Sequence, residues 1–198
     1  MAVDIQEVKR LKELTGVGIT DAKKALEEAK GNFDKALEAM RVKGLSKADK
    51  KSEREARAGI VHAYVHSDRI GVLVEVNCET DFVARTEEFK DFVHDVALHV
   101  AASAPQFITE EDIDKKTLDK ERKLFLEELK ESGKQANMLD KIADGKIKKW
   151  QAEVVLVNQP FIKDPDKTIG DYLKEKIAKL GENMTITQME RIELGARK

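Results

Sequence analysis

The spacing of the apolar residues changes near residue 59, and this change constrains the fold more than any other feature of the sequence. From there, GIVHAYVH (residues 59–66) and IGVLVEVNC (70–78) alternate apolar and polar side chains around a short SDR connection. Alternation with a period of two predicts strands, and the short connection predicts that they pair as a β-hairpin. Cys78 shares a face with the valines of the second strand, so we expect a small buried hydrophobic residue rather than a reactive thiol.

Before the hairpin, the apolar residues follow the spacing of helices. Ile5, Val8, Leu11 and Leu14 form a first stripe that ends at the two-glycine turn TGVG. Further stripes predict helices over 21–30 and 33–40. We therefore expect a three-helix domain over residues 1–42.

A charged segment follows the predicted three-helix domain. Residues 41–57 contain seven basic and three acidic residues and almost no apolar ones. This composition predicts a charged linker over 43–58, which can be helical in part. The linker has no interleaved aromatic residues, so a solvated tether is favoured over a nucleic-acid contact.

Helical spacing returns after the hairpin. It predicts a helix that ends at Ala104-Pro105, a charged helix over 116–131, two short helices within 134–157 broken near Gly145, and a helix that starts after Thr168 and ends at Gly181. MTITQMERIEL (184–194) predicts a third strand, with its apolar face formed by Met184, Ile186, Ile192 and Leu194. We expect an α+β fold in which residues 59–198 form a core of a three-stranded antiparallel sheet packed against helices.

Composition narrows the classes of function. The net charge of -2 gives no overall field toward nucleic acid or membrane, and no apolar run is long enough to span a bilayer. A single cysteine fits a reducing compartment, and the N-terminus has no apolar core of a signal peptide. We expect a cytoplasmic protein with no direct contact to nucleic acid or membrane.

The four histidines do not predict a metal site. His62 and His66 lie four residues apart on a strand, roughly 13 Å. His94 and His99 lie about 140° apart around a helix. The sequence also lacks a phosphate-binding GxxxxGK[ST] and a GxSxG nucleophile motif. We therefore expect no bound metal, no cofactor and no active site, and an interaction protein is favoured.

The stretch NCETDFVART (77–86) stands where the second predicted strand meets the next helix. It contains Phe82, one of only ten aromatic residues, beside the carboxylate of Asp81. Phe82 can pack under its own helix, or it can point outward as a large apolar contact with few rotatable bonds. The residues alone leave both possibilities open.

Two long motifs resemble the bacterial elongation factor Ts family. The first is VKRLKELTGVGITDAKKALEEAKGNFDKALEAMR, and the second is GVLVEVNCETDFVAR. Family-like patterns continue through LHVAASAPQFI, SGKQANMLDKIADGKIKKW and LVNQPFIKD, so the resemblance covers essentially the whole chain. The length is similar to that of the short form of the family, with one core subdomain.

The resemblance implies a guanine-nucleotide exchange factor for elongation factor Tu, with no catalytic residues of its own. Thr80, Asp81, Phe82 and Val83 would intrude near the GTPase's Mg²⁺ site and help to dislodge the ion. The N-terminal unit, similar to a ubiquitin-associated domain, would dock on the nucleotide domain. Its candidate contacts are Lys9, Lys12, Val17, Ile19 and Lys23.

The resemblance also implies a homodimer that binds the GDP-bound and nucleotide-free partner. We add His99, within the stripe of the helix after TDFV, to the docking residues. Thr187-Gln188-Met189-Glu190 departs from the basic and aromatic residues that many family members carry in the last strand. Two alternatives stay open: a ubiquitin-like or nascent-chain binding module, and an enzyme that uses Asp81 and nearby carboxylates.

Overall fold

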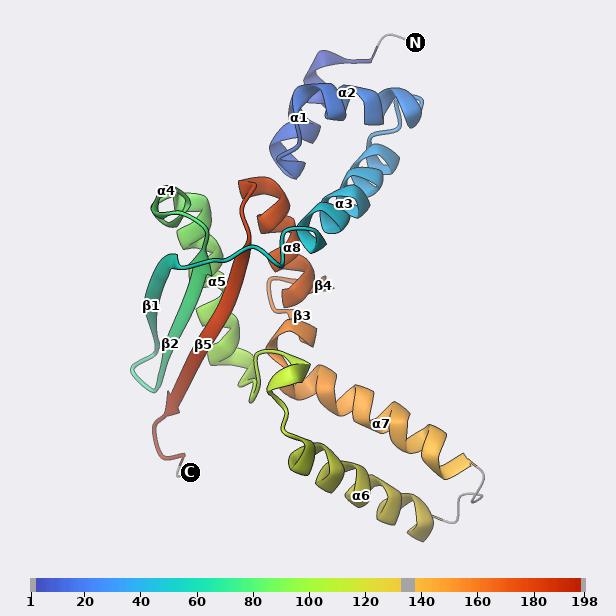
Figure 1. Ribbon diagram of the computed structural model, residues 1–198, viewed down its shortest axis with the longest axis vertical. Helices are drawn as coiled ribbons and strands as arrows, with labels where there is room; N and C mark the ends of the chain where they lie inside the picture. Colours follow the sequence, from blue (N-terminus) through green and yellow to red (C-terminus); the bar gives the residue numbers. More distant parts are fainter. Residues whose placement is uncertain (1–2, 133–137, 197–198) are drawn as a thin grey trace.

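The computed structural model describes residues 3–132 and 138–196. Figure 1 shows a group of helices at the N-terminal end, a twisted sheet with helices packed on it, and a helical hairpin that projects from the body. The structure confirms the α+β class.

The N-terminal helices are α1 (Ile5–Thr15), α2 (Ile19–Glu28) and α3 (Phe33–Asp49). Asn32 caps α3 by accepting a hydrogen bond from the backbone N–H of Lys35 at 3.0 Å. The three helices enclose a small core of their own, formed by Val8, Leu11, Ala22, Ala25, Leu26, Ala36 and Met40.

The apolar stripe of α1 is shorter than we expected. Val8 and Leu11 are buried, but Ile5 and Leu14 are exposed by 70% and 56%. Residues nine positions apart point to opposite sides of a helix at 3.6 residues per turn. Ile5 and Leu14 therefore cannot share one face.

Helix α3 runs into the segment that we expected to be a linker. Residues 43–49 are helical, and Ala48 is buried in the core of the sheet region. One turn earlier in α3, an added Cβ on Gly44 would lie 3.3 Å from the side chain of Ala178, so the helix also comes close to the segment around residue 178. The end of α3 is thus packed against the rest of the molecule.

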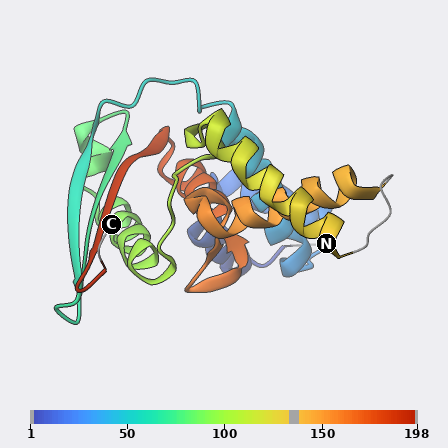
Figure 2. The same ribbon diagram turned by 90° about the horizontal axis from the view of Figure 1, so that it is seen from below.

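The sheet has the strand order β1-β2-β5 and is antiparallel throughout, with β1 at Ala58–His66, β2 at Ile70–Cys78 and β5 at Met184–Glu193. Helix α5 (Glu87–Ser103) packs on one face, and α8 (Ile169–Leu180) packs against α5 (Figures 1 and 2). Figure 2 shows no described element over the other face. The largest buried side chains of this core are Phe89, Phe92, Leu156, Ile169 and Met184.

The predicted apolar face of the last strand is right at its start and wrong at its end. Met184 and Ile186 are buried, whereas Ile192 and Leu194 are exposed by 73% and 64%. The register explains the change, because Ile186 pairs with Val76 and Gln188 pairs with Glu75, which leaves the residue between them as a β-bulge. A bulge shifts side-chain alternation by one residue, so later residues exchange faces.

The projecting hairpin consists of α6 (Lys115–Glu131) and α7 (Leu139–Val154) (Figure 1). The predicted break near Gly145 is wrong, since α7 runs through this residue. Arg122 of α6 binds Asp140 and Asp144 before the expected break, and Lys146 after it binds Glu128 of α6 at 2.6 Å. A glycine inside a helix costs only about 1 kcal/mol, which contacts across the hairpin can offset. The part of that prediction over 134–137 lies outside the described residues.

Short elements complete the chain. Figure 1 places the one-turn helix α4 (Asp81–Ala84) at the end of the sheet from which α5 begins. The predicted helix after Thr168 is confirmed as α8, with Thr168 and Asp171 in a capping box and Gly181 at its C-terminal end. The remaining elements are η1 (Glu110–Asp112), η3 (Leu156–Asn158), β3 (Pro160–Phe161) and β4 (Asp164–Thr168).

Candidate partner-binding site

Phe82 lies on the surface at the tip formed by α4. Its side chain is 86% exposed, the largest exposure among the large hydrophobic residues of the described chain. Val83 is partly buried and packs against the core, and Ala84 is buried. The next two residues therefore fill the space beneath the turn, and Phe82 is not a staple under its own helix.

Thr80 is the N-cap of α4, and its hydrogen bonds connect the tip to the rest of the chain. The backbone N–H and the hydroxyl of Thr80 donate to the carboxylate of Glu182 at 3.0 and 2.6 Å. The thiol of Cys78 donates to the carbonyl oxygen of Thr80 at 3.2 Å. Burial raises the pKa of this thiol, and the nearby Glu182 carboxylate raises it further. Cys78 is fully buried, as predicted.

The predicted docking residues of the N-terminal unit lie on adjacent elements around one turn. Lys9 and Lys12 are exposed on α1, and Lys23 is exposed on α2. Ile19, 54% exposed, begins α2, whereas Val17 is partly buried against the three-helix core. These residues thus offer two kinds of contact, positive charge and an apolar edge.

Leu14 is an exposed apolar residue beside that turn, although we predicted it to belong to the apolar stripe of the first helix. It lines a hollow of about 230 Å³ between α1, α3 and α8, together with Met40 and Glu175. The nine-residue separation from Ile5 is the signal that could have shown that Leu14 leaves the stripe.

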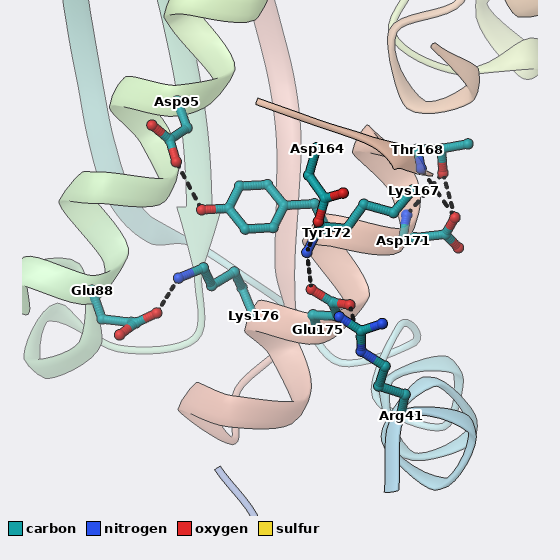
Figure 3. A network of polar contacts seen from close by, with 10 residues as sticks. All are labelled: Arg41, Glu88, Asp95, Asp164, Lys167, Thr168, Asp171, Tyr172, Glu175 and Lys176. Atoms are coloured by element: carbon teal, nitrogen blue, oxygen red, sulfur yellow. Dashed lines mark hydrogen bonds and ion pairs between the residues drawn. The ribbon is translucent and has the colours of Figure 1, made fainter. Parts of the chain in front are cut away.

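Helix α8 links the N-terminal unit to the tip. Gly16 adopts a left-handed conformation with φ of 66°, and an added Cβ would lie 2.6 Å from the Cα of Lys179. The position therefore requires glycine for two reasons, its backbone conformation and its close approach to α8. Arg41 of α3 lies 3.7 Å from Glu175, which in turn binds Lys167 at 2.7 Å (Figure 3).

The same helix reaches the start of α5. Lys176 and Lys179 both bind Glu88; Figure 3 shows the first of these pairs. Burial alone would raise the pKa of Glu88, but hydrogen bonds and charge from the two lysines hold it below its ordinary value. Farther along α5, Asp95 accepts a hydrogen bond from Tyr172 at 2.9 Å (Figure 3). The arrangement fixes α8 against the helix that follows the tip.

His99 lies in the interior of the molecule. It is fully buried, and its Nε2 lies 2.9 Å from the amide oxygen of Gln159. Burial lowers its pKa, so the neutral ring is favoured. The structure thus places His99, which we predicted as a docking residue, in the core rather than on the surface.

The structure brings together two histidines that the sequence reading did not compare. His62 of β1 and His94 of α5 approach to 3.2 Å between Nε2 and Nδ1. Only pairs on the same element could be judged from spacing, so this contact between elements was missed. Within residues 3–132 and 138–196, no cluster of three or more His, Cys, Asp or Glu side chains is placed to hold a metal ion.

Comparison with known proteins gives the family. The family model described as Elongation factor TS matches residues 2–196. The chain belongs to the elongation factor Ts family. Three elongation factor Ts proteins illustrate the similarity. That of Alkaliphilus oremlandii is 50% identical over 98% of this chain and 90% of its own length. That of Carboxydothermus hydrogenoformans is 50% identical over 96% and 88%, and that of Thermodesulfovibrio yellowstonii is 46% identical over 98% of both chains.

Membership of the elongation factor Ts family makes the chain an elongation factor of protein biosynthesis. The family implies nucleotide exchange on elongation factor Tu rather than catalysis of a covalent reaction. Among the helices that the structure describes, none is long and apolar enough to cross a membrane.

Proposed function

We propose that this chain releases GDP from elongation factor Tu by inserting the α4 tip near the Mg²⁺ that the GTPase holds with its nucleotide. The exposure of Phe82 is the observation that carries the proposal. Phe82 supplies apolar contact area, while Asp81 competes for hydrogen bonds and charge around the ion. Thr80 and Val83 orient the pair, one as the cap of α4 and the other as its inward anchor.

We propose that residues 1–42 form the docking domain, with Lys9, Lys12, Val17, Ile19 and Lys23 as its contacts. The exposed lysines and the apolar edge at Ile19 support this assignment. Residues 43–58 connect this domain to the core of residues 59–198, although α3 crosses the boundary at residue 42. Packing of Gly16 against Lys179 supports a defined separation between the docking surface and the tip.

The energetic requirement is moderate. Weakening GDP binding about 100- to 1,000-fold takes about 3 to 4 kcal/mol. One apolar anchor and the loss of metal contacts are of this order. Coupling is reciprocal, so GDP must weaken the grip of this chain on its partner by the same factor. The chain therefore binds both the GDP-bound and the nucleotide-free GTPase, and returning nucleotide displaces it.

We further propose a cytoplasmic homodimer that forms through the uncovered face of the sheet. Val61, Val65, Leu73 and Ile192 are exposed by 51% or more, and the strand register brings them to this one face. Burying such a face against a second copy removes apolar surface from water. The β-bulge contributes directly, because it is what turns Ile192 outward.

Stopped-flow release of a fluorescent GDP from elongation factor Tu, at fixed Mg²⁺, tests the exchange function. We expect strong acceleration by the parental chain and a loss of at least about 10-fold in Phe82→Ala, since an exposed anchor contributes about 2 kcal/mol or more. Leu124→Ala, which truncates another exposed side chain on α6, is the matched control and should act like the parent. A Phe82→Ala rate equal to the parental one would remove the tip from the mechanism.

A further inference from the structure

The α4 tip is too short to hold its own shape. It contains four residues, and its cap contact from the backbone N–H of Val83 to Thr80 Oγ1 is long, at 3.4 Å. A single turn fixes several backbone dihedrals for little hydrogen bonding, so it is unstable without outside support. The direction in which Phe82 points must therefore be set by contacts from elsewhere in the chain.

Glu182 supplies such a contact from 102 residues away. One carboxylate oxygen accepts the N–H of Thr80, and the other accepts its hydroxyl. Two charge-assisted bonds to one residue fix both its backbone and its side chain. Because Thr80 is the cap of α4, the same two bonds set the direction in which the turn starts.

Glu182 lies in a short loop that hydrogen bonds hold on its C-terminal side. Gly181 ends α8 in a left-handed conformation with φ of 83°. Asn183, on the other side, is buried, and its amide donates to the carbonyl oxygen of Arg54 at 2.6 Å. The backbone N–H of Asn183 donates to the side chain of Glu79 at 2.6 Å. The loop therefore forms hydrogen bonds to Glu79, to Thr80 and to the segment that leads from α3 into β1.

We propose that Glu182 is a positioning residue for nucleotide exchange, which acts by holding Thr80 so that Asp81 and Phe82 meet the partner in one orientation. This inference rests on the exchange function proposed above. Glu182 acts through the tip and touches neither nucleotide nor metal. Loss of its carboxylate leaves Phe82 present but lets the turn sample other directions.

The closing experiment compares Glu182→Ala, Phe82→Ala and the double variant by the plateau rate of fluorescent-GDP release at saturating chain. We expect Glu182→Ala to lower the plateau about 10-fold, the scale of loss for a misaligned contact group. The double variant should be slower than Phe82→Ala alone by much less than 10-fold, because only the part of the Glu182 effect that passes through Asp81 remains. Glu193→Ala, which removes an exposed carboxylate at the far end of β5, is the matched control and should keep the parental plateau.

Two results would overturn the positioning role: a parental plateau in Glu182→Ala, or losses that multiply in the double variant. Multiplied losses would mean that the Glu182 charge acts on the partner independently of Phe82. If Glu182→Ala does not fold, Glu182→Gln carries the same comparison, since it keeps the side-chain size and one acceptor oxygen.

Hydrogen exchange on the unbound chain separates this inference from the exchange function. We expect the amides of Thr80 and Val83 to exchange about 10-fold faster in Glu182→Ala, with the amides of β2 unchanged. Unchanged protection of the Thr80 amide would refute the positioning role of Glu182, even if the variant releases GDP more slowly. If the parental chain does not accelerate GDP release from elongation factor Tu, the exchange function is refuted instead. The amide exchange data would still show whether Glu182 holds Thr80 in place.

Discussion

At the scale of single residues, the decisive contacts join positions that lie far apart in the sequence. The residues around Phe82 predicted a junction between strand and helix, but not whether the ring turns in or out. Its direction depends on Val83 taking the inward place and on Glu182 holding Thr80. Spacing rules describe neighbours within one element, so neither contact could be predicted from the sequence.

The contact between His62 and His94 predicts a pH dependence of stability. Burial, and then the charge of His94, lower the pKa of His62 below its ordinary value of 6.5. The unfolded chain then binds a proton more readily than the folded one, so the free energy of unfolding falls as pH drops below about 6.5. We expect His94→Gln to lose less stability between pH 7 and pH 5 than the parental chain.

Urea unfolding at the two pH values measures this difference. The pKa of His99 is also lowered by burial, so it produces a fall of the same sign in both chains and leaves the comparison intact. Equal losses in the parental chain and in His94→Gln would mean that the pair is not coupled.

At the scale of elements, the sequence predicted most helices and all three strands of the sheet, and it failed where contacts override local preference. Helix α7 passes through Gly145 because ion pairs with α6 stabilise it at Asp140 and Asp144 before the glycine and at Lys146 after it. The β-bulge in β5 has no signal in the alternation itself, since Gln188 and Glu190 interrupt the apolar pattern either way. Helix α3 continues to Asp49, beyond the predicted stripe that ends at Met40, because Ala48 is buried in the core of the sheet region.

Gly145→Ala should therefore stabilise the hairpin. Gly145 lies within α7, and an added Cβ would meet no atom within 4 Å. Alanine reduces the conformational entropy of the unfolded chain and favours the helix, so we expect the free energy of unfolding to rise by about 0.5 to 1 kcal/mol. Urea denaturation followed by circular dichroism measures it; a decrease would mean that α7 is strained at this residue.

At the scale of the whole molecule, α8 lies between the surface proposed for docking and the tip proposed for insertion. It contacts α3 through Arg41 and Glu175, and it contacts α5 through Glu88. The α+β class followed from the change in apolar spacing, whereas this arrangement depends on side chains from three separate helices.

Deletion of residues 1–42 tests whether docking on the partner belongs to the N-terminal helices and insertion to the core. The core should stay folded, because the three-helix cluster and the sheet cluster bury separate sets of residues. We expect affinity for the nucleotide-free GTPase to fall at least about 10-fold, or about 1.4 kcal/mol, as measured by calorimetry. Parental affinity in the truncated chain would remove the docking role, and loss of the far-UV circular dichroism signal would show that the core depends on these helices.

The position of β5 in the sheet has a consequence for how the chain folds as it is made. The central strand β2 pairs with β1 across a short turn, but its other edge pairs with residues 184–193. At about 5 to 20 residues per second, roughly 5 to 20 s pass between synthesis of the two partners. During that time an apolar strand edge stays open to pairing with other chains. The emerging polypeptide thus carries its greatest risk of aggregation on the ribosome, in the interval before its last strand arrives.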